Sequence, residues 1–379
     1  MQIEAAVIQE TMPNRPVANW DRPPFVLDTL TLADPRAGEV RVRLVASGVC
    51  HSDWHLVTGD TKHPLPAVAG HEGAGVIEAV GPNVSRVQPG DHVILNWAPD
   101  CGHCFYCLRH KPSLCETYLK TMWAGVMLDG TPRLSWRGQP AYHFCSLATF
   151  ADHAVVSEQA CVPIRRDVPL DMAVLVGCAV STGLGAVLYT ADVRMGDSVI
   201  VYGCGGVGLN ILQGAKLAGA GTIIGVDTSP AKMKLATQFG ATHTVLAGDA
   251  RQTRGQLLEL TGGRGADYVF EAIGNSQVQA EALRVVRPGG TLVLVGLSPV
   301  YEQTNLSGAF IARQEKVVKG CYYGSINTRR DFPKFLDMYM AGQIKLDELV
   351  SQRYRLSEIN EAYAAMLSGD VARGVIVFE

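Results

Sequence analysis

The sequence has few charged residues and no dense run of one charge. Asp, Glu, Lys and Arg together make up 18% of the 379 residues, and the formal net charge is −3 at pH 7. No cluster of Lys and Arg reaches the density of a nucleic-acid-binding patch, so we expect no nucleic-acid partner. Hydrophobic residues reach 47%, which provides for a large core and excludes a disordered chain.

Long uninterrupted apolar stretches are also missing. None is long enough to cross a bilayer. The first residues, 1–7, have neither the basic segment nor the apolar core of a signal peptide. We therefore expect a cytoplasmic protein without a membrane partner. Because thiols stay reduced in the cytoplasm, the ten cysteines favour metal binding or catalysis over disulfides.

The length favours about two domains, and the pattern of the chain changes along it. The first part is β-rich with Pro and Gly turns, and 39–45 alternates like a strand. A later part alternates strands and helices, which is typical of a doubly wound parallel sheet. Its expected strands are 198–202, 222–226, 243–246, 267–271 and 291–295, and its expected helices are 206–218, 230–239, 251–261 and 276–285. The last strand, 374–378, is expected to rejoin the first domain.

A glycine-rich turn opens the first helix of the alternating part. Residues 203–208 read Gly-Cys-Gly-Gly-Val-Gly between a strand and a helix. Gly203 allows the tight turn, Gly205 lets backbone amides approach a pyrophosphate, and Gly208 lets the helix pack close to the strand. Alone this motif is weak, because glycine turns between strands and helices are common.

Asp227 strengthens the interpretation as a dinucleotide site. It ends the next strand about 20 residues after the glycines, where a Rossmann unit places its ribose ligand. A carboxylate there accepts hydrogen bonds from both ribose hydroxyls and repels a 2′-phosphate, which favours NAD over NADP. The alternative is an Asp at a strand end with no ligand.

Four cysteines lie close together in the sequence, at Cys101, Cys104, Cys107 and Cys115. Their spacing, C-x2-C-x2-C-x7-C, supplies four thiolates for a tetrahedral zinc ion. With every position taken by sulfur, none is left for water or substrate, so the expected role is structural. The alternatives are two disulfides, which the compartment disfavours, and an iron–sulfur cluster, which the spacing and the lack of a companion proline disfavour.

Two more groups of residues can bind metal or move protons. The first is the segment 50–55, Cys-His-Ser-Asp-Trp-His, directly after a strand end, and the second is the pair His71 and Glu72. The loop between them contains Pro64 and Pro66, so the two groups can fold back on one another. Considered individually, Cys178 is interpreted as a small residue of the core and His71 as a loop histidine that binds no metal.

In this order, the motifs of the chain resemble those of the zinc-dependent medium-chain alcohol dehydrogenases, nearly from end to end. The motifs that carry the resemblance are 48–53, 70–75, the four-cysteine segment, 177–183 and the glycine turn. The chain is most similar to the branch of thiol-dependent formaldehyde dehydrogenases and bacterial nicotinoprotein alcohol dehydrogenases. The resemblance implies an α/β fold with two domains. The first is a GroES-like β-rich catalytic domain at 1–179, which includes a structural-zinc lobe at about 97–120. A Rossmann doubly wound cofactor domain follows at 180–320, and the chain returns to the catalytic domain at 321–379.

The resemblance implies a catalytic zinc ion on Cys50, His71 and Cys178, and therefore two zinc ions per chain. Two thiolates and one imidazole leave a fourth position open for water or an alcohol, as a catalytic site requires.

Four nearby residues also match the family pattern. Ser52 and His55 match a proton relay to the surface. Asp53 matches a carboxylate that orients His71, and Glu72 matches a buried glutamate that helps to exchange the fourth ligand.

The cofactor residues follow in the same way. Asp227 and Lys232 match the contacts to the adenosine ribose, and Gly206 belongs to the glycine turn. Val207 matches a residue behind the nicotinamide ring, and Thr182 is expected to lie near that ring. His51 and Arg373 match positions that pair with the pyrophosphate. His51 departs from relatives with arginine there, and an imidazole holds phosphate less firmly than a guanidinium.

Three aromatic residues are implied in the substrate pocket. Trp97 and Phe144 match pocket walls, and Trp54 is expected to lie close by. Bulky rings narrow an inner pocket and favour primary alcohols. We find no clear equivalent of the basic residue that grips a glutathione carboxylate in the thiol-dependent branch, although Lys120 and Arg133 are candidates.

The implied reaction is the reversible, NAD-dependent oxidation of a primary aliphatic or aromatic alcohol to an aldehyde. The expected assembly is a homodimer or homotetramer, and similar proteins pair their cofactor domains along the edge strand 291–295 and the segment after it. The alternatives are an S-hydroxymethyl-thiol (formaldehyde) dehydrogenase and a nicotinoprotein that keeps its NADH. A non-catalytic NAD sensor or zinc store requires a broken set of ligands, and this set is complete. A zinc-free quinone reductase would lack the four cysteines and Cys178.

The assignment of Asp227 predicts the outcome of one substitution. Asp227→Gly removes the carboxylate that repels a 2′-phosphate, so the use of NADP relative to NAD should rise. The ratio of kcat/KM for the two cofactors measures this, and an unchanged ratio would mean that Asp227 does not face the ribose.

Overall fold

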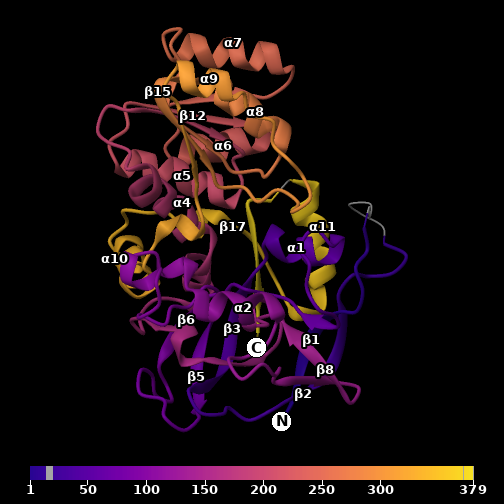
Figure 1. Cartoon of the computed structure of the whole chain (residues 1–379). Coiled ribbons are helices and arrows are strands. Elements are labelled where there is room, and N and C mark those ends of the chain that lie inside the picture. The colour runs from indigo at the N-terminus through magenta and orange to yellow at the C-terminus, as the bar shows by residue number, and fades with distance from the viewer. Residues whose placement is uncertain (14–19, 370, 379) are drawn as a thin grey trace. The chain divides into compact units, whose positions relative to one another are not determined.

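The computed structural model of the chain (Figure 1) describes residues 1–13, 20–369 and 371–378. It divides into two compact units, Met1–Cys178 with Asn327–Glu379 and Ala179–Ile326. The chain therefore leaves the first unit one residue before the expected boundary at 179, and it returns at 327 and not at 321. The difference at the second boundary arises because Gly324 packs against the backbone of Ser181 and Gly185 in the second unit.

The first unit contains a closed barrel and a mixed sheet. The barrel has the strand order β1 (Gln2–Ile8), β2 (Val26–Leu32), β7 (Leu134–Trp136), β8 (Gln139–His143) and β4 (Ala67–Val68). The sheet has the order β10 (Cys161–Pro163), β6 (His92–Leu95), β5 (Gly73–Val80), β3 (Glu39–Gly48), β18 (Arg373–Val377) and β17 (Val350–Tyr354), and β9 (His153–Ser157) also pairs with β3. The expected strands 39–45 and 374–378 correspond to β3 and β18, and their antiparallel pairing confirms that the end of the chain returns to this unit.

The register of this sheet brings three segments to one end of it. Strand β3 runs antiparallel to β5 with Ser47 opposite Gly73, so the residues that follow β3 lie beside those that precede β5. Strand β6 is antiparallel to β5, with Ile94 opposite Ala74, and β18 places Val375 opposite Gly48. Residues near 50, 71, 97 and 373 therefore meet at the same end of the sheet.

The second unit is built on a six-stranded parallel sheet, as the alternating pattern predicts. Its order is β13 (His243–Leu246), β12 (Thr222–Asp227), β11 (Ser198–Tyr202), β14 (Ala266–Glu271), β15 (Val286–Leu294) and β16 (Val317–Gly320). The helices between the strands include α5 (Gly206–Leu217), α6 (Pro230–Gln238), α7 (Ala250–Leu260) and α8 (Ser276–Arg284). The central strand is apolar because both faces of the sheet are covered, and Val199, Ile200 and Val201 are fully buried.

One expectation about this sheet is wrong. The strand expected at the edge, 291–295, belongs to β15, which pairs with β14 on one side and β16 on the other. The edge strand on this side of the sheet is β16, whose four residues, Val-Val-Lys-Gly, are too few to give a clear periodic signal.

Glycines shape the turn between β11 and α5. Gly203 has a φ of 90°, a left-handed conformation that favours glycine. A Cβ atom on Gly208 would lie only 1.7 Å from the carbonyl oxygen of Gly203, so α5 packs directly on the turn. A Cβ on Gly205 would meet no protein atom within 4 Å, so this glycine is not required by packing.

Among the described residues, no single helix combines the length and the apolar composition needed to cross a membrane. The bent helix pair Leu170–Gly177 and Ala179–Ala191 has this length and composition only when its two parts are taken together, and most of its residues belong to the buried core.

The two glycines of the turn should respond differently to alanine. Gly208→Ala forces the helix away from the turn and should lower the free energy of unfolding by about 1–3 kcal/mol. Gly205→Ala should leave stability unchanged but weaken NAD binding by roughly tenfold or more, because the methyl group fills the space that a pyrophosphate needs. Thermal unfolding and NAD titration measure the two effects, and equal losses of stability would contradict the assignment.

Candidate active site

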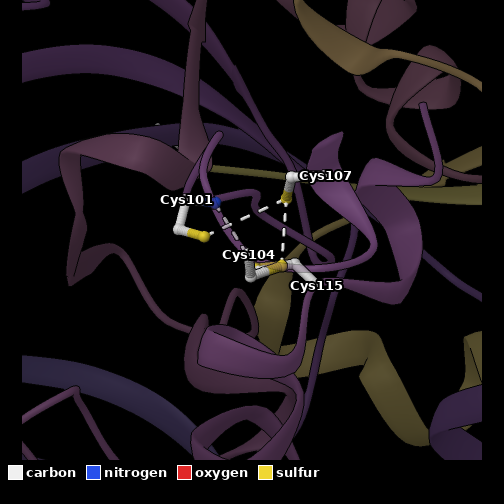
Figure 2. A group of neighbouring side chains, drawn as sticks. All are labelled: Cys101, Cys104, Cys107 and Cys115. Carbon is white, nitrogen blue, oxygen red and sulfur yellow. Dashed lines mark hydrogen bonds between the residues drawn. The ribbon is translucent and has the colours of Figure 1, made fainter. Parts of the chain in front are cut away.

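The four cysteines of the segment 101–115 meet in one group (Figure 2). Sγ of Cys104 lies 3.5 Å from Sγ of Cys107 and 3.9 Å from Sγ of Cys115, and Sγ of Cys101 lies 4.0 Å from Sγ of Cys107. Tetrahedral zinc with Zn–S bonds of about 2.3 Å requires sulfur atoms about 3.8 Å apart, whereas a disulfide joins them at about 2.0 Å. The four thiols are free and fit a closed zinc site.

A second group consists of Cys50, His71, Glu72 and Cys178, whose ligand atoms all lie within 4.8 Å of one another. All four residues are buried and belong to the first unit. Cys50 follows β3 and precedes α1 (His51–Thr58), and His71 precedes β5, so the β3–β5 register brings them together. Cys178 follows a short 3-10 turn, Val174–Gly177. Two thiols and one imidazole fit the donor set of a catalytic zinc ion.

Asp53 orients the imidazole of this group. Its carboxylate lies 3.1 Å from Nδ1 of His71 and also accepts a hydrogen bond of 2.8 Å from the backbone N–H of Gly70. With Nδ1 held in this way, Nε2 is the nitrogen available to a metal. Burial raises the pKa of Asp53, and the charge of His71 opposes that shift.

Glu72 is the fourth member of the group, and Arg373 binds it. Both carboxylate oxygens of Glu72 accept hydrogen bonds from the guanidinium of Arg373. Burial raises the pKa of Glu72 to about 7, although the charge of Arg373 acts in the opposite direction. The sequence indicated both residues but not their pairing. The expected contact of Arg373 with a pyrophosphate stays a prediction.

The expected relay residues lie along helix α1. Oγ of Ser52 lies 3.7 Å from Sγ of Cys50, and His55 follows one turn later. Nδ1 of His55 lies 3.1 Å from Oδ2 of Asp60, a residue that the sequence analysis missed because no motif contains it. The exposed His51 has its ring 5.4 Å from that of His55.

Aromatic rings surround the imidazole of His71. Trp97 and Phe144 both meet it edge to face, with centroid distances of 6.3 and 5.7 Å. The ring of Trp54 instead stacks on Trp20 and Tyr363. A role of Trp54 in the pocket stays a prediction.

Arg133 is not available for a substrate carboxylate. Its guanidinium is almost fully buried and forms ion pairs with Glu39 and Asp129. The suggestion that it grips a glutathione carboxylate is therefore wrong. Lys120, the other candidate, lies exposed on α2 (Glu116–Ala124).

The expected cofactor residues of the second unit lie near the glycine turn. The carboxylate of Asp227 accepts hydrogen bonds from the N–H groups of Cys204 at 2.8 Å and Ser229 at 3.0 Å, and Nζ of Lys232 lies 3.8 Å away. Val207 lies in the first turn of α5.

Thr182 lies on a second helix, α4 (Ala179–Gly185), which packs closely on α5. A Cβ atom on Gly183 would lie 2.4 Å from Cβ of Asn210 in α5. This close packing keeps Thr182 in the same unit as the glycine turn.

Comparisons with known proteins agree with these two units. Residues 36–166 match the alcohol dehydrogenase GroES-like domain, and residues 206–341 match the zinc-binding dehydrogenase domain. An NDMA-dependent alcohol dehydrogenase from Amycolatopsis methanolica is 43% identical over 357 residues, which are 93% of this chain and 95% of that protein. The chain belongs to the zinc-dependent medium-chain alcohol dehydrogenase family. This membership confirms the expected fold of a GroES-like unit and a Rossmann unit, in a zinc-binding oxidoreductase.

Other members of the family are similar over nearly their whole length. An alcohol dehydrogenase class-3 from Cereibacter sphaeroides is 39% identical over 367 residues, which cover 94% of this chain and 96% of that protein. The crystal structure of benzyl alcohol dehydrogenase from Acinetobacter calcoaceticus superimposes with a TM-score of 0.90 at 30% identity, and the match covers all of both chains.

The four-cysteine group predicts a change in metal content. Cys104→Ser removes one thiolate, so the zinc content should fall from two ions per chain toward one. The protein should also unfold at a lower temperature, because metal binding contributes to folding. Elemental analysis and thermal unfolding measure both effects. Cys161→Ser is the matched control, since this buried cysteine lies outside both metal groups. A zinc content of two in Cys104→Ser would contradict the structural site.

Proposed function

We propose that this protein catalyses the reversible oxidation of primary alcohols to aldehydes, with NAD as the hydride acceptor and two zinc ions per chain. The observation that carries the proposal is the buried group of two thiols and one imidazole, Cys50, Cys178 and His71. Such a donor set holds zinc with one position free, whereas four thiolates hold it with none.

The residues around the group suit the removal of a proton. When bound, zinc supplies the Lewis acidity that lowers the pKa of an alcohol hydroxyl, and NAD supplies the hydride acceptor. The hydroxyl of Ser52, close to Sγ of Cys50, would accept the alcohol proton and give up its own proton in the same relay step. His55 lies one turn further along α1, and Asp60 orients its ring for release of the proton to solvent.

Asp227 supports NAD as the cofactor. Its carboxylate ends β12 at the carboxyl edge of the parallel sheet, where dinucleotides bind in open α/β folds. Neighbouring N–H groups fix its orientation, and its negative charge disfavours the 2′-phosphate of NADP.

The rings beside His71 support a slim substrate. Trp97 and Phe144 place bulky rings against His71, which favours an unbranched carbon next to the hydroxyl. Apolar ring edges also suit an aromatic substituent. The structural similarity to a benzyl alcohol dehydrogenase agrees with this substrate class.

Two variants of this chemistry have support among the relatives. The relative named as NDMA-dependent favours an enzyme that keeps its nicotinamide cofactor and passes electrons to an external acceptor. A relative from Paracoccus denitrificans, 37% identical, is named S-(hydroxymethyl)glutathione dehydrogenase, which favours a thiol adduct as substrate. The burial of Arg133 removes one candidate for binding such an adduct.

We further propose that the protein is a cytoplasmic homodimer or homotetramer. Its ten cysteines are free thiols, as expected in a reducing compartment. The edge strand β16 pairs on one side with β15, so its other side offers backbone groups to a second copy.

The first test is the absorbance at 340 nm of the purified, zinc-loaded protein, before and after addition of NAD. Primary alcohols of increasing length, benzyl alcohol and a secondary alcohol should be compared with formaldehyde plus glutathione or mycothiol. Turnover of free primary alcohols with added NAD is expected. Absorbance before any addition, with turnover only in the presence of an acceptor such as NDMA, would indicate a retained cofactor.

Cys50→Ala provides the control for the metal group. It should abolish turnover but retain NAD binding, because Cys50 belongs to the first unit and Asp227 to the second. Turnover only with the thiol adduct would overturn the proposed substrate class, and activity in Cys50→Ala would overturn the catalytic metal site.

A further inference from the structure

A tyrosine hydroxyl lies behind the catalytic metal group and has no role in the reaction described so far. Tyr363 lies on α11 (Ile359–Ser368), and its side chain is fully buried. Its hydroxyl donates a hydrogen bond of 3.3 Å to the backbone carbonyl oxygen of Cys50. A tyrosine hydroxyl carries its proton near neutral pH, so it is a donor to this carbonyl.

The backbone carbonyl of Cys50 lies in the turn that positions the Cys50 thiol and the Asp53 carboxylate. Cys50 occupies the N-cap position of α1, and its carbonyl also accepts a hydrogen bond of 3.3 Å from the N–H of Asp53. The backbone at Cys50 sets the direction of its Sγ atom. The same turn carries Asp53, which holds the imidazole of His71.

The ring of Tyr363 has little freedom to move. It stacks on Phe25 with a centroid distance of 4.6 Å and on Trp54 with a distance of 5.9 Å, and it meets Phe150 edge to face at 6.1 Å. Because Trp54 belongs to α1, Tyr363 contacts this helix at two points, one polar and one apolar. Helices α1 and α11 can be followed side by side in Figure 1.

A second contact holds the residue before Cys50. The N–H of Val49 donates a hydrogen bond of 3.0 Å to the carbonyl oxygen of Gly374 in β18. This bond is between backbone atoms and persists in any side-chain variant. The Tyr363 hydroxyl, in contrast, is a side-chain contact to this segment that a conservative substitution can remove.

We propose that Tyr363 is a positioning residue of the catalytic metal group, whose hydroxyl fixes the Cys50 carbonyl and so the direction of the Cys50 thiolate and the start of α1. The consequence for turnover rests on the proposed alcohol oxidation, whereas the consequence for metal retention rests only on the proposed zinc ion at Cys50, His71 and Cys178. Partners that orient metal ligands typically contribute about 10- to 100-fold to metal affinity or activity.

Tyr363→Phe removes the hydroxyl and keeps the stacked ring. The rate of zinc release from the zinc-loaded protein to a chelator is measured, with Cys50→Ala as the reference for the ion of the four-cysteine group. We expect release of the catalytic ion to be about 10-fold faster or more in Tyr363→Phe. The kcat should fall while the KM for NAD stays unchanged, since the expected NAD contacts belong mainly to the second unit.

Tyr354→Phe is the matched control. Tyr354 is also a buried tyrosine of the first unit, and its hydroxyl has no hydrogen-bond partner among the described residues. It should release zinc at the rate of the unchanged protein, and both variants should unfold at similar temperatures.

Zinc release from Tyr363→Phe at the unchanged rate would overturn the proposal. So would equal acceleration in Tyr354→Phe, because the effect would then follow from packing alone. If the unchanged protein does not oxidise alcohols, the proposed function is wrong. The zinc-release rates of the two variants and the unchanged protein can still be compared in that case.

Discussion

The antiparallel pairing of β3 with β5 is the constraint on which the active site depends. With Ser47 opposite Gly73, the chain beyond one strand and the chain before the other meet, which places Cys50 beside His71. Flanking strands add Trp97 and Arg373 at the same end. A shift of this register by one residue would turn the side chains of a strand to the opposite face of the sheet. The metal site is therefore a property of the sheet and not of a flexible loop.

Charge in this buried group is balanced by pairing. Asp53 faces His71, Glu72 faces Arg373, and Sγ of Cys50 lies near Cys178. A buried carboxylate without a partner would take up a proton, because burial disfavours the charged form. The group therefore keeps its negative charges close together only because cations, supplied by the chain or bound as a metal ion, lie among them.

The sequence predicted the parts of the molecule whose signals are local. The elements from β11 to β15 and the glycine turn follow from periodicity and from positions that only glycine tolerates. The four-cysteine group follows from spacing alone. The pairing of Arg373 with Glu72 and the contact of Tyr363 with Cys50 join residues about 300 positions apart, so no local pattern contains them. Strand β16 was missed because it is short, and Arg133 was misjudged because its buried acidic partners come from distant segments.

The first unit is assembled from both ends of the chain, while the second is one continuous segment, Ala179–Ile326. During synthesis the inserted unit has all six strands of its sheet before β18 exists. Domains generally fold as units as they leave the ribosome. The mixed sheet of the first unit is complete only when β17 and β18 have been made, so we expect the Rossmann unit to acquire its fold before this sheet does. The surroundings of the candidate metal group are consequently complete only after translation has passed Tyr363 and Arg373.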